Sequence, residues 1–113
     1  MNKAPNYYRQ GDVLLVRVVS APESEPTKHA EYTVQHGEAT GHHHTLYPSV
    51  DGVGTAPTLD LFSTGSSRFI KLDTQWLLKH QEHTALQIEP GVYEIIIEEE
   101  YDPFSRVIRE VID

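Results

Sequence analysis

Four histidines in two short segments are the residues of this sequence best suited to chemistry. His42 and His44 belong to a run of three consecutive histidines, and His80 and His83 are the two ends of the segment HQEH. Neutral imidazole is a common ligand of transition metals, and three or four imidazoles can bind one ion. We therefore predict one metal-binding site, with His42, His44, His80 and His83 as its ligands.

The spacing of the histidines predicts how each segment contributes to this site. In a β-strand alternate side chains share a face, so His42 and His44 should point to one side and His43 to the other. His80 and His83 can approach the same ion if the backbone turns or bulges between them, or if they form a helical turn. The competing interpretation is a set of separate surface histidines.

The residue types also limit the metal and its chemistry. The chain contains no cysteine, which excludes thiolate ligands. A divalent transition metal is expected, with zinc first, while Fe, Mn, Ni and Cu also accept imidazole ligands. Three imidazoles, with or without the carboxylate of Glu82, leave a coordination position open for water or substrate, as in catalytic sites. Glu82 and Glu38 are the candidate catalytic carboxylates. No phosphate loop or dinucleotide fingerprint is present, so no other cofactor is expected.

Length, charge and hydropathy define the class of protein. The 113 residues suit a single domain, which we expect to span residues 1–113. The 17 acidic residues outnumber the 9 Lys and Arg and give a net charge of −8, which disfavours nucleic acid as a partner. No apolar run approaches the roughly 20 residues of a membrane-spanning helix. The first residues lack the apolar stretch of a secretory signal, so we expect a cytoplasmic protein.

Short β-strands must position these histidines. β-branched residues, period-two alternation and turn residues predict strands at residues 13–19, 31–36, 59–62, 68–72, 92–98 and 106–112. Residues 74–80 read as a strand or one helical turn, and we favour the strand. Turns are expected at residues 11–12, 63–67 and 89–91. Seven or eight short strands with hardly a helix signal predict an all-β barrel or sandwich of the jelly-roll or cupin type.

Several motifs, in their order along the chain, resemble those of known families. The segments RQGDVLL (9–15), GEATGHHH (37–44), HQEH (80–83) and EYDP (100–103) together resemble a family of small uncharacterised bacterial and phage β-proteins. That resemblance implies a shared domain but no particular activity. A looser likeness is to cupins, whose barrel interior carries a His-x-His pair, a carboxylate and a later histidine. It implies His42 and His44 as the pair and His83 as the later ligand, with Glu82 replacing the carboxylate.

Three hypotheses about function follow from these observations. The first is a metal-dependent β-barrel enzyme acting on a small molecule. The second is a non-enzymatic phage or accessory binding module whose metal is structural or lies at a subunit interface. The third is an interaction domain without metal. A small-molecule substrate, a protein partner and a homo-oligomer are all compatible with the sequence, whereas nucleic acid and membrane are not expected.

Overall fold

The computed structural model describes residues 5–36, 42–49 and 56–98, where the chain forms ten β-strands and no helix. The strands are β1 (Tyr7–Gln10), β2 (Val13–Val18), β3 (Thr27–His29), β4 (Tyr32–His36), β5 (His43–Pro48), β6 (Leu59–Thr64), β7 (Ser67–Leu72), β8 (Trp76–Lys79), β9 (Leu86–Ile88) and β10 (Gly91–Ile97). The strand predicted at residues 106–112 and the candidate carboxylate Glu38 lie outside the described residues.

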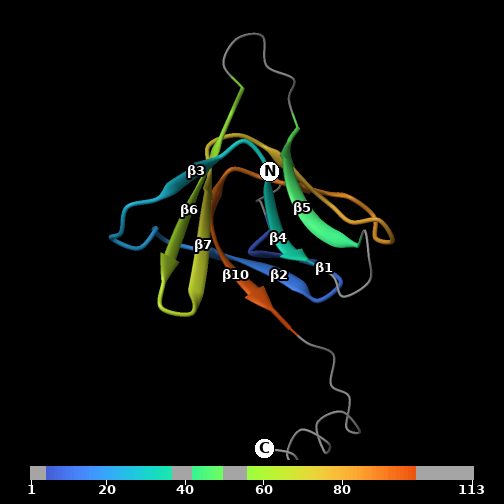
Figure 1. Ribbon diagram of the computed structural model, residues 1–113, viewed down its shortest axis with the longest axis horizontal. Coiled ribbons are helices and arrows are strands. Elements are labelled where there is room, and N and C mark those ends of the chain that lie inside the picture. Colours follow the sequence, from blue (N-terminus) through green and yellow to red (C-terminus); the bar gives the residue numbers. More distant parts are fainter. Residues whose placement is uncertain (1–4, 37–41, 50–55, 99–113) are drawn as a thin grey trace, which may run out of the picture.

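The strands form two antiparallel sheets that pack as a sandwich. One sheet has six strands in the order β1-β2-β10-β7-β6-β3, and the other has four in the order β4-β5-β8-β9. Figure 1 shows β6, β7, β10 and β2 as successive strands of the larger sheet. The predicted all-β class is therefore confirmed. Of the two predicted architectures the sandwich is the observed one, because the two sheets remain separate and do not close into a barrel.

The strand count differs from the prediction for a local reason. Ten strands are found in the described part of the chain, where seven or eight were expected for the whole chain. The additional ones include β3 and β9, which have three residues each. Three residues are too few for a period-two pattern to stand out from a loop. Residues 76–79 form a strand, as favoured, and β8 pairs with both β5 and β9.

The core lies between the two sheets and contains apolar side chains from both. Trp76 and Tyr93 are its largest fully buried side chains, one from each sheet. Alternation is clear in β8, where Trp76 and Leu78 are buried and Lys79 is exposed. The other fully buried residues of the core are Val13, Leu15, Leu46, Leu59, Ile70, Leu72 and Ile88. This core fixes which face of each strand can carry polar chemistry.

The β1–β2 turn requires a glycine next to the histidines. Gln10 pairs with Val13, so Gly11 and Asp12 form a two-residue hairpin turn. Gly11 has φ +59°, which is the left-handed conformation that glycine adopts readily, and it occupies the first central position as in a type II′ turn. A Cβ atom at Gly11 would lie 2.8 Å from His83 Nε2 and 3.3 Å from His44 Cε1. The absence of a side chain lets this turn pack against both imidazoles.

The end of β1, with the turn that follows it, and the end of β10 are joined by direct contacts. The guanidinium of Arg9 forms an ion pair with the carboxylate of Glu98 at 2.9 Å. The backbone N–H of Glu98 also donates to the carbonyl of Asp12 at 2.7 Å. Both strands flank β2 in the same sheet. Residues 9 and 98 therefore lie side by side.

Candidate functional site

Strand β5 presents different side chains to its two faces. His44 and Leu46 point toward the core, where they are 4 % and 0 % exposed. His43, Thr45 and Tyr47 alternate with them and line a pocket on the outer face. The predicted division between His43 and His44 is therefore confirmed. The alternation along β5 therefore creates two polar regions. The inner region contains His44, and the outer region contains His43, Thr45 and Tyr47.

The inner region is organised by a buried glutamine of β1. The Gln10 side chain is 3 % exposed, and its Nε2 donates to the carbonyls of Leu78 at 2.8 Å and Thr84 at 2.9 Å. Its Oε1 must therefore act as the acceptor toward His44 Nδ1, 2.8 Å away. This contact places the proton of the neutral His44 ring on Nδ1 and leaves a lone pair on Nε2.

Asp12 lies on the other side of the His44 ring. Its Oδ1 is 3.4 Å from His44 Nε2, and its Oδ2 accepts a hydrogen bond from Gln35 Nε2 at 3.2 Å. Burial is the main cause that lowers the pKa of His44 below 6.5, and the neighbouring His80 lowers it further, while Asp12 acts in the opposite direction. His44 thus lies between the Gln10 amide and the Asp12 carboxylate, and burial with the neighbouring His80 favours its neutral form.

The remaining predicted ligands come together around His44. Strand β8 ends at Lys79, and bends at residues 81–83 bring the rings of His80 and His83 to a centroid distance of 4.7 Å. The His80 ring stacks on His44 at 4.3 Å, and the His42 ring meets His80 edge-on at 5.8 Å. We call His42, His44, His80 and His83 the imidazole group. Bends are present between His80 and His83, and ring contacts connect these four residues.

The prediction that the protein binds a metal ion through this group is nevertheless wrong. The described residues contain no group of three or more His, Asp or Glu side chains that could hold a metal ion. The ring of His44 lies within 29° of parallel to His80 and within 19° of parallel to His83. Ring-nitrogen lone pairs lie in the ring plane, so stacked imidazoles do not direct them at one point. His44 Nδ1 is also bound to Gln10, and His80 Nδ1 accepts from the N–H of Glu82.

This correction extends to the hypotheses built on the metal. A metal-dependent enzyme and a module with a structural metal both required His42, His44, His80 and His83 to bind an ion, and neither is supported. Glu82, the candidate carboxylate among the described residues, lies 3.7 Å from His42 Nε2 and is 66 % exposed. Its contact is a peripheral one between an imidazole and a carboxylate at the protein surface.

Acidification should destabilise the fold through His44. Because its pKa is lowered in the folded state, the unfolded chain binds this proton more readily. The stabilisation from neutral His44 is complete above about pH 6.5 and is lost as the pH falls below that value. Urea unfolding between pH 7.5 and 5.0 should show this loss, and His44→Gln should reduce the pH dependence. An NMR titration that gives His44 a pKa of 6.5 or higher would contradict the prediction.

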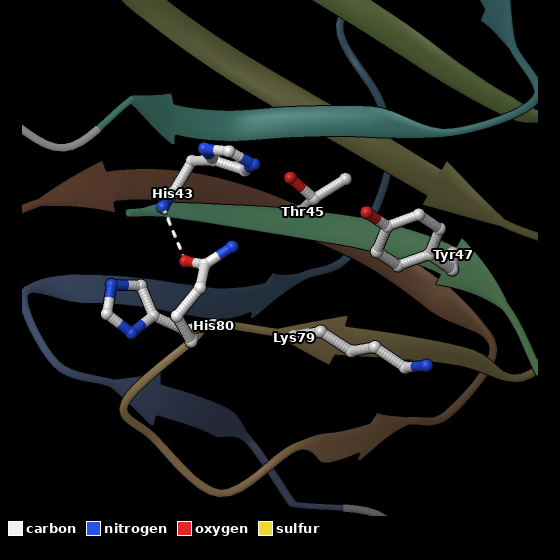
Figure 2. Close-up of a pocket in the computed structure, with 6 residues that line it drawn as sticks. His43, Thr45, Tyr47, Lys79 and His80 are labelled. Atoms are coloured by element: carbon white, nitrogen blue, oxygen red, sulfur yellow. Dashed lines mark hydrogen bonds between the residues drawn. The ribbon is translucent and has the colours of Figure 1, made fainter. Parts of the chain in front are cut away.

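The outer region is a small pocket on the exposed face of β5 and β8. It encloses about 240 Å³ and is lined by the six residues His43, Thr45, Tyr47, Lys79, His80 and Gln81. Figure 2 shows His43, Thr45 and Tyr47 projecting from β5, and Lys79 and His80 on the side of β8. Thr45 and Lys79 are direct partners in the β5–β8 pairing. The register of these two strands therefore creates the pocket.

Contacts within the pocket orient its side chains. The backbone N–H of His43 donates to Gln81 Oε1 at 2.9 Å. Lys79 Nζ lies 5.5 Å from the centre of the Tyr47 ring, which places the ammonium over the aromatic face. The Thr45 hydroxyl is 3.0 Å from that of Thr33 on β4. His80 lines the pocket and also stacks on His44, so it connects the outer pocket with the imidazole group.

Sequence reasoning missed several residues of both regions. Gln10 follows Tyr8 by two positions, so strand alternation places both on one face, and a polar residue on a buried face signals a structural hydrogen bond. Asp12 was interpreted only as part of a turn. No sequence pattern indicated that Lys79 and Tyr47 lie together, because their proximity depends on the register of strands some thirty residues apart.

A comparison with known families covers most of this structure. Residues 9–98 match the model of a family described as "Domain of unknown function (DUF8820)". The chain belongs to this family. The DUF8820 match includes Gln10, Asp12, the imidazole group and the outer pocket. It confirms the expected membership in an uncharacterised family, while the segment at residues 100–103 falls outside the match.

Other comparisons add no further relative. The chain showed no significant similarity to a curated protein or to a solved structure. The expected likeness of this DUF8820 member to cupins is not supported, and its two separate sheets differ from a closed cupin barrel. Within the described residues, no helix is long and apolar enough to cross a membrane.

Proposed function

We propose that this DUF8820 protein is a binding module that takes a small polar molecule into the outer pocket of β5 and β8. The observation that carries the proposal is the pocket itself, a recess of about 240 Å³ with polar side chains on its walls. Small-molecule sites are concave and use a few placed polar groups to orient the ligand. The outer pocket has this form.

The position of the pocket on paired strands supports a binding role. Thr45 and Tyr47 on β5 pair with Lys79 and Leu77 on β8 through the sheet ladder, so the backbone spacing of the walls is fixed. Leu46 and Leu78, which alternate with these residues, are fully buried in the core beneath. A site on rigid strands loses little conformational entropy when a ligand binds.

The imidazole group is less suited to receive a ligand directly. The His44 side chain is 5 % exposed, and both of its ring nitrogens face protein groups, Gln10 and Asp12. A ligand would have to displace these contacts. The outer pocket offers the half-buried His80 ring from the same group without that cost.

Gln81→Ala should weaken ligand binding and leave the fold intact. Gln81 is exposed and lines the pocket, so its loss removes a polar wall group and the acceptor of the His43 N–H. The measurement is ¹H–¹⁵N NMR with a panel of small polar probes: malonate, malonamide, 1,3-diaminopropane and glycerol. We expect at least one probe to shift amides of residues 43–47 and 79–81 saturably, with affinity reduced about fivefold or more in the variant.

Gln87→Ala provides the matched control. Gln87 is an exposed glutamine of β9 in the same sheet but outside the pocket. Its replacement should change neither the shifted residues nor the affinity. If no probe of the panel produces saturable shifts at the pocket, the proposed function fails. The expected protein partner, homo-oligomer and cytoplasmic location stay predictions beside this proposal.

A further inference from the structure

We infer that the ligand of the outer pocket is a small anion, a carboxylate or a phosphate. This inference rests on the proposed function and specifies its ligand class. All six lining side chains can donate a hydrogen bond, and one of them, Lys79, carries a positive charge. No carboxylate belongs to the lining formed by the described residues. The chain as a whole has a net charge of −8, so a pocket lining without acidic groups differs from its overall composition.

The orientation of Gln81 makes it a donor toward a ligand. Its Oε1 already accepts the hydrogen bond from the N–H of His43 at 2.9 Å. The NH₂ group of the same amide provides two donors, while Oε1 retains one lone pair. A ligand that meets this NH₂ group has to supply an acceptor, which is what a carboxylate or phosphate oxygen does.

Lys79 supplies a charge that the other described residues leave without a partner. Arg9 and Lys28 form ion pairs with Glu98 and Asp60 at 2.9 and 2.8 Å. Lys79 instead lies over the Tyr47 ring, and no described carboxylate comes within ion-pair distance of its Nζ. An anion in the pocket would complete the coordination of this ammonium through a charge-assisted hydrogen bond.

The size of the pocket limits the anion to a small one. Its volume of about 240 Å³ lies below the range of roughly 300–1,000 Å³ that is usual for drug-sized ligands. A nucleic acid strand is disfavoured by the net charge of −8. These two limits leave a compact mono- or dianion with a few oxygen atoms.

The experiment compares probes of matched size and different charge on the full chain. Malonate and inorganic phosphate are titrated against malonamide and 1,3-diaminopropane at constant ionic strength, with ¹H–¹⁵N NMR as the readout. We expect malonate, phosphate or both to shift the amides of Thr45, Tyr47, Lys79 and Gln81 saturably. Which of the two binds more tightly identifies the source of the anionic group. The neutral and cationic probes should bind at least about tenfold more weakly.

Two charge-matched variants make the test specific. Lys79→Met should reduce the affinity for the anionic probe about tenfold or more. Lys71→Met removes an equal charge from an exposed position of β7 in the other sheet and should change it less than about twofold. Equal binding of malonamide and malonate, or equal effects of the two variants, would overturn the anion assignment and leave the pocket as a binding site. Failure of every probe to bind would overturn both the assignment and the proposed function.

Discussion

Replacing Gln10 by Ala is expected to destabilise the protein by about 3–4 kcal/mol. The amide of this residue joins β1 of one sheet to β8 of the other and to the segment after it, through Leu78 and Thr84. It also accepts the hydrogen bond that fixes the His44 ring. Truncation leaves the Leu78 carbonyl and the His44 ring N–H without their partner in a buried site, and each such group costs about 1–3 kcal/mol. The Thr84 carbonyl is only partly buried and adds less. Urea denaturation at pH 7 measures the loss.

A second variant separates hydrogen bonding from volume. Gln10→Glu keeps the size of the side chain but places a carboxylate oxygen against the carbonyls of Leu78 and Thr84. We expect a loss at least as large as that of Gln10→Ala. Wild-type stability of Gln10→Glu at pH 7 would show that the amide does not join the sheets. Gln87→Ala, at an exposed glutamine of β9, should change stability by less than about 0.5 kcal/mol.

Gly11→Ala is expected to cost about 2–3 kcal/mol through two separable effects. The first is backbone strain, because a residue with a Cβ atom at φ +59° costs about 1–2 kcal/mol. The second is the contact of that Cβ with His83 Nε2 at 2.8 Å, which forces the imidazole group to shift. Thermal or urea unfolding gives the sum, and the histidine ring resonances in NMR report the displacement.

Gly65→Ala isolates the first effect. Gly65 has nearly the same φ, +56°, in the β6–β7 turn, but an added Cβ would meet nothing within 4 Å beyond its chain neighbours. We expect a loss of about 1–2 kcal/mol and unchanged histidine resonances. If Gly11→Ala and Gly65→Ala have equal effects on stability and on those resonances, the β1–β2 turn does not pack against the imidazole group as described.

The sequence was informative about most strands that exceed four residues, although the six-residue strand β5 lies outside the predicted strand ranges. The β-branched run of β2 and the Pro90-Gly91 turn before β10 predicted two neighbouring strands of the large sheet within a residue of their observed bounds. The three-residue strands β3 and β9 were not predicted, because they form through pairing with β6 and β8. Their existence depends on tertiary pairing, which local residue patterns do not record.

The candidate site shows a similar limit. Composition and spacing singled out His42, His44, His80 and His83, and strand alternation separated His43 from His44. The chemistry of the group was not predictable, because metal binding depends on where ring lone pairs point. That direction is set by Gln10 on β1 and by stacking between rings, and neither can be inferred from histidine spacing. The outer pocket required the β5–β8 register, which no short motif contains.

The contact between residues 9 and 98 has a topological consequence for the DUF8820 segment. Because residues 9 and 98 lie side by side, a short peptide could connect the two ends of this segment without stretching the fold. New ends could then be opened in the β6–β7 turn, where Gly65 has free space around it. The segment is therefore suited to circular permutation, and equally to insertion into a surface loop of a host protein.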